Sequence, residues 1–377
     1  MSTESRAASG PSVALPMSGD DGNWVTLPNV AVLESSNDNF KFQTFRNYFG
    51  AFALAITETY GESPYARLAI TVRGLPGVRK LRRRALSEMD SRRATHELRA
   101  AWGFEIALGR LAEIATDDAP ELVMIENLTL AVSAHFALYR ASRALALARG
   151  DQAPEQHETY LEQTATQLVQ RGLLPPPLCC TCAAGSPPDS PTRAPHAFNG
   201  FPMEGVEPCD AGFSPDPALM WQLIAKALKT TRDSHRTFEA KKEAWRKNHP
   251  VQHSRKAPGS MRKRPVPHEV QDQIYAEMRP VNVFDLIYRM RRRSHYLDDV
   301  SFLSPLISPS DARAFNRDLT LITRSALCAI EVLIGIAAGS ALVENAKSEF
   351  AARIGATLVK CTFGGRIVGS VGRQAGS

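Results

Sequence analysis

The chain has 377 residues, of which 44% are hydrophobic and 22% are charged, a composition typical of globular proteins with two or three domains. No stretch of about 18 consecutive apolar residues is present, so the sequence predicts no membrane span. Six cysteines in a chain of this length do not make a disulfide framework, and we expect an intracellular, reducing compartment.

The net charge of +6 is unevenly distributed along the chain. Residues 1–214 carry a net charge of −5 and residues 215–377 a net charge of +11. Because an excess of positive charge favours polyanionic partners, the second part of the chain is the better candidate for nucleic-acid binding.

Composition divides the chain into five segments. Residues 1–22 are rich in Ser, Gly and Ala and predict a disordered arm, while residues 363–377 predict a flexible tail. Two regions with helical periodicity, a first half over 23–172 and a second half over 216–362, flank a proline-rich segment over 173–215. Proline at this density removes backbone donors and interrupts helices, so we expect residues 173–215 to form an extended linker.

The predicted linker carries four of the cysteines. Cys179, Cys180, Cys182 and Cys209 together offer the four thiolates of a zinc site. Their spacing fits no familiar zinc motif, and an extended linker does not preorganise ligands. The sequence therefore favours an unstructured thiol cluster over a structural zinc site.

Four helices are predicted in the second half. Asp216 followed by Pro217 is typical of a helix start, and a second helix covers about 232–246. A third helix ends in a run of arginines, and the fourth extends from about Asp311 into the 340s with an apolar stripe along it. Four helices with one long basic loop, over 250–267, predict an antiparallel bundle.

The arginine run at the end of the third helix comprises Arg289, Arg291, Arg292 and Arg293. A solvated cap that complements the helix dipole is the simplest explanation for cations at this place. Four arginines within five residues exceed what a cap needs. A phosphate backbone would offset their mutual repulsion, because a guanidinium binds phosphate oxygens in a bidentate way.

The fourth helix carries a second polar set. Arg317 and Arg324 are seven residues apart, so about two turns place them on one face, with Asp318 and Ser325 as an adjacent pair. We expect this polar stripe to face the arginine run.

The landmarks of the second half occur in the order used by one family of viral coat proteins. They are Asp216-Pro217 with Ala227-Leu228, Arg236-Thr237-Phe238 with Trp245, the arginine run, Asp298-Asp299, Arg317-Asp318 and Arg324-Ser325-Ala326. Over residues 216–325 the chain resembles the coat proteins of tobamoviruses and related rod-shaped plant viruses.

The resemblance implies an all-α fold in which two helices clamp single-stranded genomic RNA between successive layers of a rod. It assigns this role to the following residues: Arg292, Arg293, Asp318, Arg324 and Ser325. Two positions depart from the family pattern, because Arg317 stands in place of an aspartate and Ser294 in place of an arginine.

The resemblance also assigns carboxylates to contacts between subunits. Asp298, Asp299 and Asp311 fall where the family places carboxylates that face those of a neighbouring subunit. Like charges at such a contact raise their pKa values and bind protons or weakly bind calcium, so assembly would depend on pH. Plain exposure to solvent is the alternative, and no other cofactor is expected.

The first half resembles a diverged copy of the second. Arg46-Asn47-Tyr48 matches Arg236-Thr237-Phe238 at an offset of 190, and Leu128-Thr129-Leu130 matches Leu319-Thr320-Leu321 at an offset of 191. A near-constant offset is typical of a tandem duplication.

The first half lacks most of the predicted RNA-binding set. Asn127 stands for Asp318, Ser133 stands for Arg324, and its own arginine run, Arg82-Arg83-Arg84, lies elsewhere. We therefore expect RNA binding to reside mainly in the second half.

The sequence thus predicts two tandem antiparallel four-helix bundles of the tobamovirus coat-protein type, joined by a linker. It contains no catalytic motif, and we expect no enzyme. The predicted function is a capsid protein that assembles with itself into a helical rod around single-stranded viral RNA, in virions and the host cytoplasm. The alternatives are a basic helical RNA-binding protein that forms no rods (a viral movement protein, silencing suppressor or nucleoprotein) and a bacterial helical-repeat scaffold.

Overall fold

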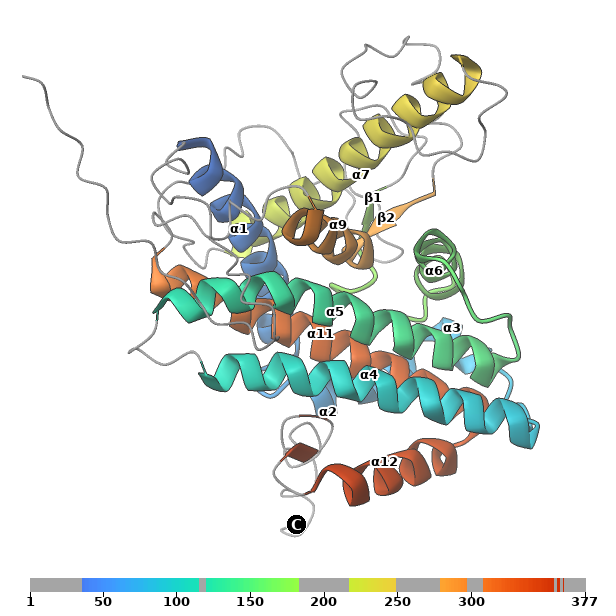
Figure 1. Ribbon diagram of the computed structural model, residues 1–377. Coiled ribbons are helices and arrows are strands. Elements are labelled where there is room, and N and C mark those ends of the chain that lie inside the picture. Colours follow the sequence, from blue (N-terminus) through green and yellow to red (C-terminus); the bar gives the residue numbers. More distant parts are fainter. Residues whose placement is uncertain are drawn as a thin grey trace, which may run out of the picture.

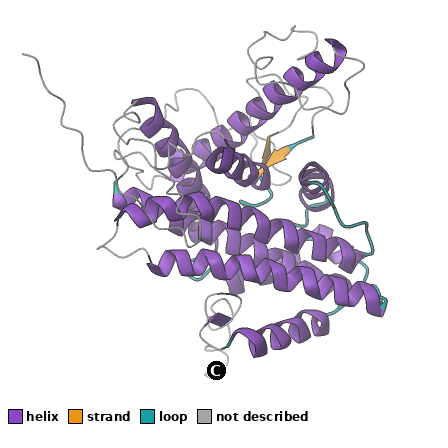
Figure 2. Cartoon of the chain, viewed as in Figure 1, coloured by secondary structure: helices purple, strands orange, loops and turns teal. Residues whose placement is uncertain are grey.

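A computed structural model describes residues 36–114, 120–182, 217–248, 279–296 and 308–355, together with Leu358, Val359 and Thr362. These parts are helices joined by loops, with one pair of two-residue strands, so the all-α class is confirmed (Figure 2). The predicted arm and tail, the whole of the basic loop, Cys209 and the pair Asp298-Asp299 lie outside the described residues.

The elements follow one another as shown in Figure 1. The first half and its continuation contain α1 (Ser36–Tyr60), α2 (Tyr65–Gly74), α3 (Pro76–Arg79), α4 (Glu88–Ile114), α5 (Pro120–Arg149), α6 (His157–Gln163), a π-helical turn (Thr164–Val169) and β1 (Thr181–Cys182). The second half contains α7 (Pro217–Asn248), β2 (Val281–Asn282), α9 (Val283–Tyr296), α11 (Pro309–Ala338) and α12 (Ser340–Ile354). β1 and β2 pair antiparallel, with Thr181 opposite Asn282.

Two predicted helix boundaries differ from the structure. The first and second helices expected in the second half form the single helix α7, because the sequence between Leu228 and Arg232 contains neither Gly nor Pro to interrupt it. The helix expected to run into the 340s is broken at Gly339, which separates α11 from α12 and has a positive φ of 102°.

Helices α4, α5 and α11 form the centre of the molecule, with α5 antiparallel to α4 and parallel to α11 (Figure 1). The side-chain amide of Asn127, near the start of α5, donates to the carbonyl of Ala312, near the start of α11, at 3.0 Å. Leu147 near the end of α5 belongs to the same cluster as Leu342, just past the end of α11. The two helices therefore lie side by side at the same level.

α5 and α11 also match in length and in both ends. Each has 30 residues, and each begins with a proline, where the missing N–H removes no helical hydrogen bond. Each is followed by a glycine with positive φ, Gly150 at 77° and Gly339 at 102°. These two glycines are 189 positions apart, close to the offset of the sequence landmarks.

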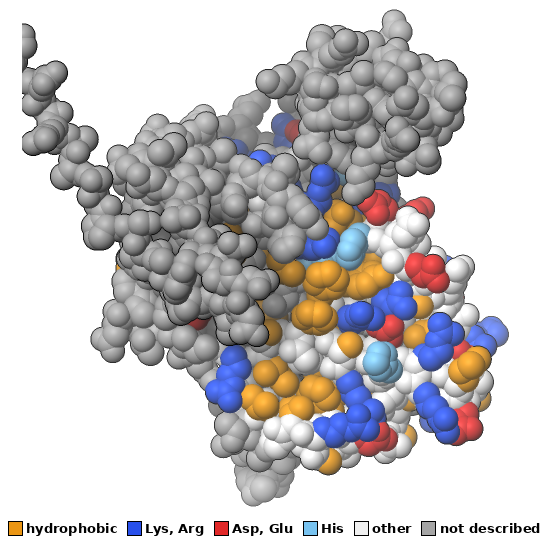
Figure 3. Space-filling model, viewed as in Figure 1, with side chains coloured by type: hydrophobic (Ala, Val, Ile, Leu, Met, Phe, Trp, Pro, Cys, Tyr) orange, Lys and Arg blue, Asp and Glu red, His pale blue; other side chains and the backbone are white. Residues whose placement is uncertain are grey.

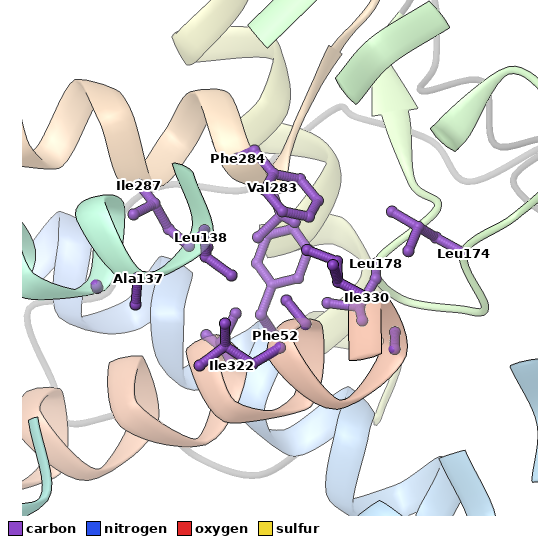
Figure 4. Packing of buried hydrophobic residues seen from close by; sticks show 14 of the residues in the cluster. Phe52, Ala137, Leu138, Leu174, Leu178, Val283, Phe284, Ile287, Ile322 and Ile330 are labelled. Carbon is purple, nitrogen blue, oxygen red and sulfur yellow. The ribbon is translucent and has the colours of Figure 1, made fainter. Parts of the chain in front are cut away.

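Helices of both halves fill one hydrophobic core. In Figure 4, Phe52 of α1 and Leu138 of α5 lie among Phe284 of α9 and Ile322 and Ile330 of α11. α11 packs against α1 and α2 as well as α4 and α5. Its apolar stripe is therefore covered by helices of the first half. The described residues share this core and do not form a separate core for each half.

The prediction of an extended linker is wrong for residues 173–182, and so is that of an unstructured thiol cluster for the cysteines in this stretch. Leu174, Leu178, Cys179 and Cys180 are fully buried, and the hydroxyl of Tyr60 donates to the carbonyl of Pro176 at 2.5 Å. The prolines set the direction of this segment, but its leucines and cysteines supply enough apolar surface to hold it against the core.

By length and composition, α11 is the one helix among the described residues that could cross a membrane. Its apolar window has a mean hydropathy of 1.9, because a few polar residues interrupt it without dominating it. More than half of that window is buried in the protein, which is the profile of a central core helix.

Candidate nucleic-acid interface

The position of the arginine run is set at the start of α9. The Asp285 carboxylate accepts from Arg279 Nη1 at 2.9 Å and from the backbone N–H of Asn282 at 3.0 Å. The Asn282 side chain in turn accepts from the N–H of Phe284 at 2.9 Å. These bonds satisfy donors at the start of α9 and join it to β2, so its other end extends over α5 and α1.

Arg289 and Arg293 lie over the first helix of the chain. Arg289 Nη1 donates to the hydroxyls of Thr230 and Thr231, each at 3.2 Å. The guanidinium carbons of Arg289 and Arg293 are 5.3 and 5.0 Å from the ring centre of Phe45. Both cations therefore have partners in the chain, which stabilise the contact of α9 with α1 and α7.

Arg291 and Arg292 lie on another side of α9, over aromatic rings. The guanidinium carbon of Arg291 is 5.0 Å from the ring centre of Phe136 and 5.8 Å from that of Tyr288, while Arg292 is 6.0 Å from Tyr288. Phe136 is stacked on Phe104, with ring centres 5.3 Å apart and planes 21° apart. We name these five residues the arginine–aromatic seam, and all five are half-buried.

A histidine pair lies behind the seam. His135 Nε2 is 3.0 Å from His157 Nδ1, which joins α5 to the start of α6. Burial lowers the pKa of His135 to about 2, with further contributions from His157 and Arg291. Burial and Arg291 also lower the pKa of His157. The pair is therefore neutral at physiological pH.

The four predicted residues of α11 have unlike environments. The side chain of Arg317 is 76% exposed and its Nε is 3.0 Å from Asp318, whereas Arg324 Nε is 3.5 Å from the fully buried Glu105. Burial raises the pKa of Asp318, partly opposed by Arg317 and Arg46. Ser325 is fully buried, so it does not reach a surface where RNA would lie.

The predicted polar stripe of α11 does not face the arginine run. Asp318 lies toward Arg46 of α1 and Arg324 contacts Glu105 of α4, whereas α9 packs against α5 and α7. The four arginines of α9 therefore lie together, but the polar residues of α11 (Arg317, Asp318, Arg324 and Ser325) do not line the same surface as these arginines. Arg317 is the exposed member of that second set.

Asp311 has partners within its own chain. Its carboxylate accepts from Gln43 Nε2 at 3.1 Å and from Ser308 Oγ at 2.8 Å, and Arg46 Nε lies 3.3 Å away. Ser308 is also the N-cap of α11, because its hydroxyl accepts from the N–H of Asp311. The structure therefore places Asp311 at a contact between α1 and α11 within one chain.

The arginine run of the first half, Arg82-Arg83-Arg84, lies beyond the C-terminal ends of α5 and α11. The N–H of Arg84 donates to the carbonyl of Ala337 at 2.7 Å. The guanidinium groups of Arg83 and Arg84 lie against Gly339 and Gly150, so they complement the C-terminal dipoles of α11 and α5. Arg82 is exposed.

The sequence analysis assigned no functional role to the buried cysteines or to the aromatic residues of the seam. A hydrogen bond from Cys180 lowers the pKa of Cys179, while burial raises that of Cys180. Among the described residues no group of three or more His, Cys, Asp or Glu is placed to hold a metal ion. Tyr288, directly before the arginine run, was the signal in the sequence that could have identified the seam.

Hydrophobic side chains gather beside Lys and Arg on the face where α4 and α5 lie (Figure 3). This mixture is typical of surfaces that bind single-stranded nucleic acid, where cations neutralise phosphates and rings stack on bases. Comparisons with protein-family models, curated proteins and solved structures found no match for the chain.

Proposed function

We propose that the protein is a capsid protein that assembles into a helical rod and encloses single-stranded RNA, in virions and in the host cytoplasm. The observation that carries this proposal is the relation between α5 and α11. These helices have equal lengths, matching ends and a near-constant offset, which supports a tandem duplication of one coat-protein unit.

The parallel arrangement of α5 and α11 bears on assembly. A two-fold axis perpendicular to two equivalent helices would make them antiparallel. A two-fold contact uses the same face of both copies, so it forms a closed dimer and does not extend further. α5 and α11 run parallel at the same level, which excludes a two-fold axis perpendicular to them. A displacement that takes one copy onto the other without reversing its helices fits this arrangement, and repeating such a displacement between chains would produce an open array.

RNA binding is assigned to α9. Its four arginines concentrate positive charge in the half of the chain with a net charge of +11. Phosphate contacts without base-specific hydrogen bonds accept any sequence, which packaging of a whole genome requires. Arg317, exposed on α11, extends the cationic surface. No enzymatic step and no resident cofactor belong to this proposal.

Negative-stain electron microscopy of the purified full chain, with and without single-stranded RNA, tests the proposal. We expect rods, and we expect the RNA within them to resist nuclease. A protein that binds RNA but stays a monomer or small oligomer under all conditions would contradict the capsid function. That result would favour a movement protein, a silencing suppressor or a nucleoprotein.

A further inference from the structure

We propose that the arginine–aromatic seam between α5 and α9 is a base-stacking site for single-stranded RNA. The proposal rests on the proposed binding of RNA and gives it a second component. In this assignment the rings of Phe104, Phe136 and Tyr288 stack on bases, while Arg291 and Arg292 contact the phosphates beside them.

The geometry of the rings carries the first step. Phe104 and Phe136 come from antiparallel helices α4 and α5 and are stacked nearly parallel, with ring centres 5.3 Å apart. Both rings are half-buried, so each is held by the core on one side and has accessible surface on another. A rigid, partly exposed pair of rings is the arrangement on which successive bases of a single strand stack.

Arg291 extends the platform and links it to the cationic surface. Its guanidinium lies between Phe136 and Tyr288, at 5.0 and 5.8 Å from their ring centres. The guanidinium plane stacks on bases as well as on side-chain rings, and its N–H groups bind phosphate oxygens. Arg292, 6.0 Å from Tyr288, continues this cationic edge along α9.

Two buried polar atoms of the same cluster have no hydrogen-bond partner. They are His135 Nδ1 and Arg291 Nε. An unsatisfied buried donor or acceptor is costly, and a native structure usually completes it with a bound water or ion where the chain does not. Arg291 is half-buried and His135 is fully buried, so of the two only the Arg291 side chain can contact a base that stacks on the rings.

A metal ion does not suit this place, although two histidines meet there. The positive charge of Arg291 is close enough to lower the pKa of both His135 and His157. The same charge opposes a bound cation, and in the part of the chain that the structure describes no group of three or more His, Cys, Asp or Glu is placed to hold a metal ion. The cluster therefore favours a ligand that is aromatic and attached to an anion.

The experiment compares ten-nucleotide oligomers of adenylate and uridylate binding to the full-length protein, measured by fluorescence anisotropy at several salt concentrations. Adenine stacks more strongly than uracil, so a stacking site prefers the adenylate oligomer. The variant is Phe104→Leu with Phe136→Leu, which keeps apolar bulk but removes the rings. Tyr65→Leu, a half-buried aromatic residue of α2, is the matched control.

We expect the double variant to lose about tenfold in affinity for the adenylate oligomer and much less for the uridylate oligomer, because stacking contributes roughly 1–3 kcal/mol per base. The dependence of affinity on salt should be unchanged, since no charge is removed. The control should bind both oligomers as the parent does. Equal loss for the two oligomers, or no loss for either, overturns the proposal.

Photocrosslinking of the unmodified parent protein to a 5-iodouridine oligomer provides a readout that does not depend on how the variant folds. We expect crosslinks in the peptides that contain Phe104, Phe136 or Tyr288. Crosslinks confined to the loop of Arg82-Arg83-Arg84 would overturn the stacking site while leaving the capsid function standing. Crosslinks at the seam in a protein that forms no rods would support the stacking site and reject the capsid function.

Discussion

Arg46 of α1 and Asp311 of α11 form an ion pair, with Nε and Oδ1 3.3 Å apart, that joins the first described helix to the start of the last long one. Gln43, one turn before Arg46, donates to the other carboxylate oxygen at 3.1 Å. Both side chains of the ion pair are largely shielded from solvent, at 15% and 23% exposure. The contact therefore holds the two halves of the chain together at one end of the core.

Asp311→Asn is expected to lower the free energy of unfolding by about 1–2 kcal/mol, because it removes a half-buried ion pair and a charge that favours the helix N-terminus. Urea denaturation followed by circular dichroism measures this change. If the variant were instead as stable as the parent and kept rods intact to higher pH, Asp311 would act between subunits as the coat-protein resemblance implies.

Arg324→Gln and Arg317→Gln form a matched pair on one helix. Arg324 is 23% exposed and contacts the fully buried Glu105, so its loss leaves a buried carboxylate with less compensation. The side chain of Arg317 is 76% exposed. We expect Arg324→Gln to reduce the free energy of unfolding by about 1–3 kcal/mol and Arg317→Gln by less than about 0.5 kcal/mol.

Equal stability of these two variants in urea denaturation would contradict the structural role of Arg324. The difference also affects any study of RNA binding. A loss of RNA protection in Arg324→Gln would have to be compared with the loss of folded protein, whereas a loss in Arg317→Gln would report on binding directly.

The sequence predicted helices well because their signals are local. Proline at position 217 and the apolar stripe of α11 each depend on residues within a few turns of one another. The arginine run was also correctly placed at the end of a helix, since charge clusters are visible in the sequence.

The packing partners could not be predicted in the same way. Periodicity shows that α9 and α11 each have a buried stripe, but many apolar stripes are compatible with either one. The choice of α5 as the partner of α9 depends on Phe136 meeting Arg291, a contact between residues more than 150 positions apart. Likewise, the prolines after Leu174 concealed a segment whose burial depends on distant Tyr60.

Gly339→Ala is expected to destabilise the protein by about 1–3 kcal/mol. Its φ of 102° and ψ of 143° lie in a region that side chains with a Cβ rarely adopt, and the added carbon would also displace the guanidinium of Arg83. Gly103→Ala is the control, because Gly103 lies within α4 and an added Cβ there meets nothing within 4 Å. That change should stabilise by about 0.5–1 kcal/mol.

Thermal denaturation should show a lower melting temperature for Gly339→Ala and a higher one for Gly103→Ala. An unchanged melting temperature for Gly339→Ala would mean that the boundary between α11 and α12 tolerates a different backbone conformation. Loss of stability in Gly103→Ala would show that the exposed face of α4 is covered in the protein.

The stability of the protein should fall as the pH is lowered from 7 to 5, with His135 as a main cause. Burial lowers its pKa to about 2 in the folded state, whereas an unfolded histidine has a pKa of about 6.5. Between these values the unfolded chain binds a proton that the folded protein does not. Protonation therefore favours unfolding, and stability is lost as pH falls below about 6.5. One such histidine accounts for about 2 kcal/mol between pH 7 and pH 5.

His135→Phe removes this proton binding and keeps a ring among Phe136, Tyr139 and Tyr160. We expect the difference in the free energy of unfolding between pH 7 and pH 5, measured in urea, to be smaller by about 2 kcal/mol in this variant. His96→Gln, at an exposed site on α4, should leave the difference as it is in the parent. If His135→Phe kept the full pH dependence, the histidine pair would not be the buried neutral contact between α5 and α6, and other groups would carry the acid sensitivity.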